Sequence, residues 1–215
     1  MNKKYIFFDL DGTLTDPQEG ITKSVQYALK SYGIMVEDRS QLNKFIGPPL
    51  DWSFEEFYGF SHEQAVEAVG RYREHFGVKG KFENKVYEGI PKLLGKLKEA
   101  GKILIVATSK PTYYSKQILE HFDLAKYFSD VQGSEMNGER TDKAEVIAYA
   151  MKQNHIVDPD EIIMVGDREH DMIGARKNGI QPVGVLYGYG TREELEKSGA
   201  AFIAQSVEDL ERILL

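Results

Sequence analysis

Four short apolar runs, separated by longer amphipathic stretches, constrain the fold of this chain more than any other feature of its sequence. The runs cover residues 5–8, 103–107, 162–165 and 183–186. Compact apolar runs bounded by polar residues or glycine are typical of strands that are buried on both faces of a parallel sheet. Helical periodicity lies between them, over residues 90–100, 114–121, 143–154 and 171–178. The alternation predicts an α/β fold with a doubly wound, Rossmann-like parallel sheet, whose ligand site lies beyond the carboxyl ends of its strands.

One stretch interrupts this alternation. Residues 17–84 show helical periodicity without a convincing core strand, and Pro17, Gly20, Gly80 and Asn84 lie near its two ends. Glycine, proline and asparagine are common in the turns and loops that separate structural elements. We therefore expect an α/β core domain formed by residues 1–16 and 85–215 and an inserted helical cap domain formed by residues 17–84. The insertion either only adds stability or acts as a lid over the site.

Composition excludes several classes of function. The 215 residues carry a net charge of −7 and include no cysteine. An acidic chain lacks the excess of lysine and arginine on which binding to nucleic acid polymers or anionic membranes depends, so neither partner is expected. The first apolar run is too short for a signal peptide or a membrane span, and the absence of cysteine suits a reducing compartment, so we expect a cytoplasmic protein. No sequence feature indicates an oligomeric state.

Two pairs of carboxylates follow apolar runs. Asp9 and Asp11 come directly after the first run, and Asp167 and Asp171 come after the third. A parallel sheet would bring both pairs to the same edge, where clustered carboxylates repel one another unless a cation holds them. Hard oxygen ligands with room for water and a substrate phosphate suit Mg²⁺.

A calcium loop is the alternative explanation of the first acidic pair. An EF-hand loop that began at Asp9 would require glycine at its sixth position and glutamate at its twelfth. Those positions hold Leu14 and Gly20. The sequence therefore excludes an EF-hand, and Asp-Gly alone would indicate only a turn.

Three further polar residues are candidates for phosphate binding. Thr108 and Ser109 follow the second apolar run, at a loop that enters a helix, where hydroxyls and amides can hold a phosphate oxygen or simply cap the helix. Lys143 begins a helical stretch, where an isolated lysine is usually a solvated surface group. The segment from Gly188 to Glu193 begins like a dinucleotide-binding fingerprint, but Glu193 replaces the third glycine, so we set that interpretation aside.

Taken in order, Asp-x-Asp-Gly-Thr, Thr-Ser at a strand end, Lys and Gly-Asp-x-x-x-Asp resemble the motifs of the haloacid dehalogenase superfamily. The branch most similar to this chain contains the phosphoglycolate-phosphatase-like and 5'-nucleotidase-like phosphatases, and the resemblance extends to the insertion and its Ile-Gly-Pro-Pro-Leu segment at 46–50. The resemblance implies that Asp9 is the nucleophile, which forms an aspartyl-phosphate, and also a magnesium ligand. It implies that Asp11 is the general acid and base, with its backbone carbonyl on the metal.

The resemblance also implies roles for the remaining motif residues. Thr108 and the amide of Ser109 would bind the transferring phosphoryl group, and Lys143 would neutralise charge on that group and on Asp9. Asp167 and Asp171 would complete the magnesium site. Fixed cations and donors of this kind stabilise the charge of a phosphoryl-transfer transition state.

Three functions remain open from the sequence. The first is a Mg²⁺-dependent phosphatase that acts on a small phosphorylated metabolite, such as phosphoglycolate, a nucleoside monophosphate or a sugar phosphate. The second is a phosphomutase of the β-phosphoglucomutase type, which shares these motifs. The third is a non-catalytic protein that binds a phosphometabolite, although every motif position is occupied by the residue that catalysis requires.

Overall fold

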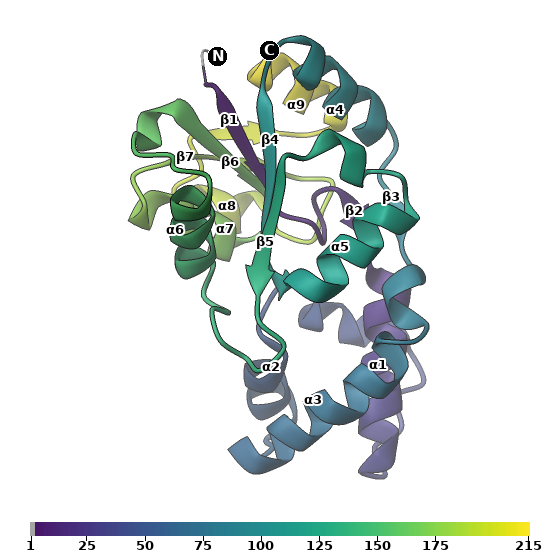
Figure 1. Cartoon of the computed structure of the whole chain (residues 1–215). Coiled ribbons are helices and arrows are strands. Elements are labelled where there is room, and N and C mark those ends of the chain that lie inside the picture. Colours follow the sequence, from purple (N-terminus) through teal and green to yellow (C-terminus); the bar gives the residue numbers. More distant parts are fainter. Residues whose placement is uncertain (1–2) are drawn as a thin grey trace. The chain divides into compact units, whose positions relative to one another are not determined.

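A six-stranded parallel sheet forms the centre of the computed structural model, which describes residues 3–215 (Figure 1). The spatial order of its strands is β5-β4-β1-β6-β7-β8. Their bounds are Tyr5–Phe8 (β1), Ile103–Pro111 (β4), Asp130–Ser134 (β5), Ile162–Gly166 (β6), Gln181–Val185 (β7) and Phe202–Ala204 (β8). The first strand of the chain is therefore a central strand, flanked by β4 and β6. The doubly wound parallel sheet predicted from the sequence is confirmed.

The register of the central strands explains how the sheet builds a core. Phe7 of β1 pairs with Ile105 of β4 on one side and with Met164 of β6 on the other. These three side chains are fully buried and belong to one hydrophobic cluster with α6 (Lys143–Gln153) and α7 (Glu169–Lys177). Each such side chain contributes about 1.5–3 kcal/mol through its burial. The packing fixes the strand ends, and with them the residues that follow.

Further helices complete the α/β unit (Figure 1). They are α4 (Ile90–Glu99), α5 (Thr112–His121), α8 (Arg192–Lys197) and α9 (Val207–Leu214), with short 3-10 turns at Ala125–Tyr127 and Pro159–Glu161. Helix α4 contacts β4 and α9, whereas α5 contacts β4 and β5. Helices α4 and α5 thus both pack against β4, and α5 also packs against the edge strand β5.

Two strands of the six-stranded sheet were not predicted from the sequence, and neither were β2 (Thr15–Asp16) and β3 (Lys85–Val86), the two short strands of a separate pair. Strands β5 and β8 lie at the two edges of the sheet, and each contains exposed or half-buried positions. An edge strand contacts one neighbour and does not need a continuous apolar run, so its sequence gives a weak signal. The observed β7 also begins two residues earlier than the predicted run at 183–186, and β4 extends beyond its predicted end to Pro111.

The chain divides into two compact units, which are Met1–Asp16 with Val86–Leu215 and, separately, Pro17–Lys85. The second unit is helical and is inserted into the first. It contains α1 (Gln18–Ser31), α2 (Leu50–Tyr58) and α3 (His62–Phe76), together with 3-10 segments at Arg39–Phe45 and Gly80–Phe82. Strands β2 (Thr15–Asp16) and β3 (Lys85–Val86) pair with each other at the two points where the chain passes between the units.

Local sequence accounts for the inserted helices. The side chain of Ser61 accepts a hydrogen bond from the amide of Gln64, whose side chain in turn accepts one from the Ser61 amide, and this capping box starts α3. Gly20 lies so close to Gly80 that a Cβ atom on Gly20 would be 1.9 Å from the Gly80 carbonyl oxygen. Only glycine permits this approach between α1 and the end of the insertion.

Within residues 3–215, we find no helix of the length and apolarity that a membrane span requires.

Candidate active site

The candidate site lies at the carboxyl ends of adjacent strands. Asp9 directly follows β1 and Asp167 directly follows β6, and β1 and β6 are neighbours in the sheet. The amide of Asp9 donates a hydrogen bond of 2.9 Å to the carbonyl of Val165, which continues the pairing of the two strands. Ligand sites of doubly wound sheets lie at this edge, next to the strand where the winding direction changes.

Three carboxylates form a buried cluster there. One oxygen atom from each of Asp9, Asp167 and Asp171 lies within 4.8 Å of the others, and the exposed fractions of these residues are 7%, 1% and 1%. Burial raises the pKa of Asp167 well above its usual value, and the nearby Asp171 and Asp9 raise it further. Burial also raises the pKa of Asp171, although Lys143 opposes this effect. Such a cluster favours either bound protons or a bound cation.

Lys143 binds two of the three carboxylates. Its Nζ lies 2.8 Å from Asp9 Oδ1 and 2.8 Å from Asp171 Oδ1, and it donates a hydrogen bond of 3.2 Å to the carbonyl of Ala107. Burial by itself would lower the pKa of Lys143, but the charges of Asp171 and Asp9 raise it above its usual value. An ammonium group has three hydrogens. The number of contacts to Lys143 Nζ matches these three donors, and the lysine stays charged.

The helix that carries Lys143 is positioned by its own cap. The side chain of Asp142 accepts hydrogen bonds from the amides of Ala144 and Glu145, which fixes the first turn of α6. Lys143 is the first residue of that helix, so its side chain reaches back to the strand ends. The sequence-based expectation that an isolated lysine at this place is a solvated surface group does not apply here, since Lys143 is 5% exposed.

A second lysine holds Asp11. Lys110 Nζ lies 2.6 Å from Asp11 Oδ2, and both side chains are largely buried. Burial raises the pKa of Asp11, Lys110 lowers it, and the neighbouring Asp9 raises it. The sequence motifs assigned no role to Lys110. The available signal was its place at the end of an apolar run, directly after Thr108 and Ser109.

Thr108 and Ser109 lie in the last part of β4. Thr108 is buried, and its Oγ1 accepts a hydrogen bond of 3.3 Å from the amide of Lys110. The carbonyl of Ser109 accepts a hydrogen bond of 2.8 Å from Ser134 Oγ at the end of β5. The β4–β5 pairing is irregular between Ala107 and Pro111, so this segment departs from the regular strand at the place where the site begins.

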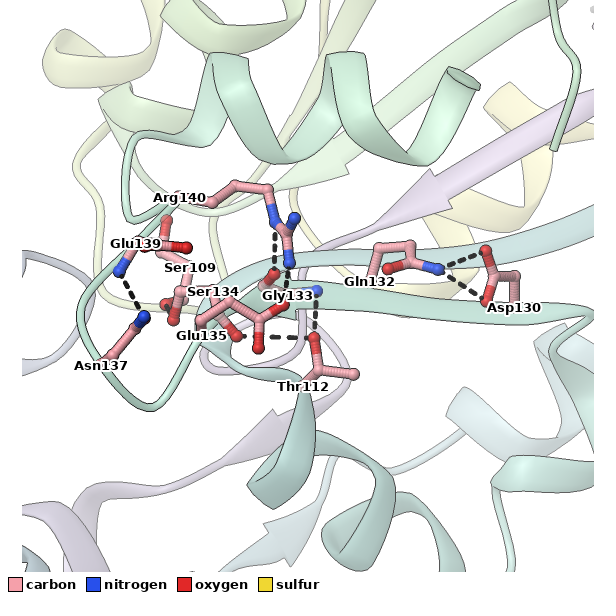
Figure 2. A network of polar contacts seen from close by, with 10 residues as sticks. All are labelled: Ser109, Thr112, Asp130, Gln132, Gly133, Ser134, Glu135, Asn137, Glu139 and Arg140. Carbon is pink, nitrogen blue, oxygen red and sulfur yellow. Dashed lines mark hydrogen bonds and ion pairs between the residues drawn. The ribbon is translucent and has the colours of Figure 1, made fainter. Parts of the chain in front are cut away.

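The loop between β5 and α6 is held by a network of polar contacts, which Figure 2 shows from close by. Arg140 has a positive φ of 57°, a strained conformation for a residue with a side chain. Its guanidinium binds the carbonyl of Gly133 and the carboxylate of Glu135, and it lies 3.7 Å from the centroid of the Tyr149 ring. These contacts compensate for the strain and fix the loop that leads to Lys143.

The buried carboxylates fit a magnesium ion. Mg²⁺ prefers oxygen ligands, accepts a small number of carboxylates and keeps positions for water and substrate phosphate. The cluster offers one oxygen from each of Asp9, Asp167 and Asp171, and carboxylates packed this closely in a buried site favour a divalent cation. The donor set therefore matches the metal predicted from the sequence.

Most predicted site residues converge. Lys143 joins Asp9 to Asp171, Asp167 lies in the same cluster, and Asp11 is bound to Lys110. The fold and this site define a doubly wound α/β protein with a buried acidic centre at the carboxyl edge of its sheet. The chain belongs to the haloacid dehalogenase-like hydrolase family, whose sequence pattern matches residues 6–185. The family predicted from the motifs is confirmed, and so is the prediction of a hydrolase.

Individual relatives are similar over almost the whole chain. A 5'-nucleotidase of Pseudomonas aeruginosa is 44% identical over 209 residues, which cover 97% of this chain and 94% of the relative. The tyrosine-protein kinase PtkA of Mycobacterium tuberculosis is 36% identical, with coverage of 97% of this chain and 72% of that protein. The crystal structure of a predicted phosphatase from Clostridium acetobutylicum matches with a TM-score of 0.97 and 53% identity, over 100% of this chain and 99% of that one.

Proposed function

We propose that this protein is a Mg²⁺-dependent phosphatase that hydrolyses monoesters of small phosphorylated metabolites through an aspartyl-phosphate on Asp9. The observation that carries the proposal is the position of Asp9, whose carboxylate lies 2.8 Å from Lys143 Nζ and inside the cluster with Asp167 and Asp171. Fixed positive charge next to a carboxylate nucleophile reduces the electrostatic repulsion between that carboxylate and a phosphate dianion.

In the first step, a carboxylate oxygen of Asp9 forms a bond to phosphorus, and the bond from phosphorus to the ester oxygen breaks. Asp11 gives its proton to the departing oxygen, which leaves as an alcohol. The raised pKa of Asp11 favours the protonated form that this step requires. The products are the free alcohol and an acyl phosphate on Asp9.

In the second step, water attacks the same phosphorus atom. Asp11, now a carboxylate, accepts a proton from that water, and the bond between phosphorus and the Asp9 oxygen breaks. Inorganic phosphate leaves, Asp9 returns to its carboxylate form and Asp11 is again protonated. One neighbouring carboxyl group thus serves as acid and then as base.

The other residues hold the transferring group and balance its charge. Asp9, the backbone carbonyl of Asp11, Asp167 and Asp171 would hold Mg²⁺, which supplies positive charge to the phosphoryl oxygens when it is bound. Lys143 adds a second positive charge beside Asp9. Thr108 and the amide of Ser109 bind and orient the phosphoryl oxygens.

The proposed substrate class is the nucleoside monophosphates, with phosphoglycolate and sugar phosphates as the alternatives. The support is the 5'-nucleotidase relative, which is 44% identical over almost the full length of both chains. The inserted helical unit, Pro17–Lys85, acts in this proposal as a cap that selects the substrate and excludes water.

The test measures release of inorganic phosphate from a panel of nucleoside monophosphates, phosphoglycolate and hexose phosphates, with Mg²⁺ and with excess chelator. Wild type is compared with Asp9→Asn and with Asp123→Asn as a matched control. Asp123 is an exposed aspartate with a positive φ of 56°, which asparagine tolerates. The proposal expects turnover that needs Mg²⁺ and Asp9 and that Asp123→Asn retains. Full activity in Asp9→Asn would exclude the aspartyl-phosphate mechanism.

Borohydride trapping adds a direct test of the intermediate. An acyl phosphate on Asp9 is reduced to the alcohol, so peptide mass spectrometry should find homoserine at position 9 after the protein is mixed with substrate.

A second experiment addresses the similarity to the tyrosine-protein kinase PtkA. A tyrosine-containing peptide is added to protein and substrate, and phosphoryl transfer to the peptide is compared with release of inorganic phosphate. Transfer to tyrosine faster than to water would favour a kinase-like activity, and dependence on a sugar bisphosphate activator would favour a phosphomutase.

A further inference from the structure

The loop between β7 and α8 lies directly against Asp167. Its residues 186–191 include Gly188, Tyr189 and Gly190. A Cβ atom on Gly188 would lie 2.4 Å from Asp167 Cβ and 2.4 Å from the carbonyl oxygen of Gly12, and one on Gly190 would lie 1.9 Å from the Asp167 carbonyl oxygen. The backbone of this loop therefore occupies the space in which other residues would place side chains. This packing accounts for the two glycines that resemble a dinucleotide fingerprint.

The loop also orients the carboxylate of Asp167. The amide of Tyr189 donates a hydrogen bond of 2.8 Å to Asp167 Oδ2, and Thr13 Oγ1 lies 3.4 Å from Asp167 Oδ1. On a third side, a Cβ on Gly12 would be 2.1 Å from Asp167 Oδ2. A buried carboxylate that is enclosed by backbone has one orientation, and that orientation depends on where residue 189 lies.

Two tyrosine side chains of the same loop reach the segments that connect to the helical insertion. The hydroxyl of Tyr189 donates a hydrogen bond to Asp16 Oδ1, and Asp16 is the last residue before the inserted unit. The hydroxyl of Tyr187 donates one of 3.1 Å to the carbonyl of Thr13, and its ring packs edge-on against Tyr87, 5.0 Å between centroids. Tyr87 directly follows β3, where the chain returns from the insertion.

Both hydroxyls donate hydrogen bonds in the structure, to the carbonyl of Thr13 and to the carboxylate of Asp16. Burial raises the pKa of Tyr187, and the charge of Asp167 raises it further. Burial and the hydrogen bond to Asp16 raise the pKa of Tyr189. These two hydrogen bonds anchor a loop that contains two glycines and compensate for the conformational entropy that the glycines lose when the loop is ordered.

We propose that Tyr189 is a positioning residue that couples the metal-binding carboxylate of Asp167 to Asp16, the residue from which the inserted unit departs. Its amide holds Asp167, and its hydroxyl fixes the loop to β2. A displacement at Asp16 is then transmitted to Asp167 through one residue. The inference rests on the proposed magnesium site, and it adds a residue that contributes no atom to the metal or the substrate.

The test measures metal affinity without substrate. Mn²⁺ is titrated into Tyr189→Phe and wild type, and free Mn²⁺ is followed by electron paramagnetic resonance. The variant keeps the ring and the amide and loses only the hydroxyl. We expect Mn²⁺ binding to weaken by roughly tenfold, the lower end of the effect of groups that orient a metal ligand. Saturating metal should restore most of the turnover number.

Tyr27→Phe is the matched control. The Tyr27 hydroxyl also binds a carboxylate, that of Glu74, but this contact lies in the inserted unit, so its loss should leave Mn²⁺ binding unchanged.

A double-mutant cycle identifies the partner. Asp16→Ala should weaken Mn²⁺ binding by a similar factor, and Asp16→Ala combined with Tyr189→Phe should be no weaker than either single variant, since both remove the same contact. Additive losses would overturn the coupling, as would an unchanged Mn²⁺ affinity in Tyr189→Phe. If wild type itself binds no Mn²⁺, both the inference and the proposed metal site are wrong. Binding by wild type with an unaffected Tyr189→Phe overturns the inference alone.

Discussion

Ion pairs of similar length, 2.8 Å and 2.6 Å, occur in two different regions of this protein. At the sheet edge, Lys143 lies 2.8 Å from Asp9, and the two side chains are 3% and 11% exposed. On α8, Lys197 lies 2.6 Å from Glu193, and each side chain is 75% exposed. Water and salt screen the second pair, whereas the first pair is surrounded by protein and by other carboxylates. The comparison teaches that burial, not distance, decides what an ion pair contributes.

The largest expected effect comes from removal of Lys143. Lys143→Met leaves the buried Asp9 and Asp171 without their cation, and removal of one partner of a buried pair costs about 3–5 kcal/mol. Urea unfolding at neutral pH in the presence of chelator measures this loss. We also expect phosphatase activity to fall by about 10²–10³-fold, because a charge that stabilises the transferring phosphoryl group is removed. A loss of stability below about 1 kcal/mol would contradict the comparison.

The second effect is that of metal on stability. Because the carboxylate cluster exists only in the folded chain, Mg²⁺ at 100 times its Kd should raise the free energy of unfolding by about 2.7 kcal/mol. Asp167→Asn should abolish this dependence, since it removes one of the three clustered carboxylates, whereas Asp123→Asn should preserve it. Thermal unfolding with Mg²⁺ and with chelator provides the measurement. An Asp167→Asn variant that Mg²⁺ still stabilises fully would place the metal elsewhere.

A smaller and more specific effect concerns pH. Lys110 lowers the pKa of Asp11 against the larger effect of burial, so Lys110→Met should raise this pKa further. The first step needs protonated Asp11, and kcat/KM therefore falls as pH rises through the pKa of Asp11. The alkaline limb of the profile should move to higher pH in Lys110→Met and stay in place in Lys197→Met. An unmoved or lowered limb in Lys110→Met would exclude Asp11 as the acid.

The smallest effect is expected on α8. Lys197→Met breaks an exposed i,i+4 pair, which contributes at most about 0.5 kcal/mol and less as salt increases. Urea unfolding should show little change, and activity should equal that of wild type. A cost comparable to that of Lys143→Met would mean that distance alone sets the strength of these pairs.

The parts of the fold that the sequence predicts are those with a strong periodic signal. The central strands β1, β4, β6 and β7 are apolar runs because helices and neighbouring strands surround them, and four runs at the right spacing imply a doubly wound sheet. The edge strand β5 has the sequence Asp-Val-Gln-Gly-Ser, which contains a single large apolar residue. Nothing in five such residues distinguishes an edge strand from a loop.

The parts of the site that motifs do not reveal depend on tertiary contacts. Lys110 looks like a surface lysine in the sequence, and its burial beside Asp11 arises only when β1 and β4 pair. Tyr189 lies in a segment that resembles an incomplete nucleotide-binding motif, and its contact with Asp167 joins residues that are 22 positions apart. The family resemblance supplies roles for conventional motif positions, but not for the residues that hold them in place.

The strand order also has a consequence for synthesis on the ribosome. Strand β1 leaves the ribosome first, yet its partners are β4 and β6, and the pairing with β6 reaches Val165. At roughly 5–20 residues per second, translation from Phe8 to Val165 takes about 8–30 s. Throughout that interval the edge of Tyr5–Phe8 that pairs with β6 in the folded protein stays unpaired, and an unpaired edge can pair with the wrong strand. Asp9 acquires its neighbours Asp167 and Asp171 only after most of the polypeptide has been translated.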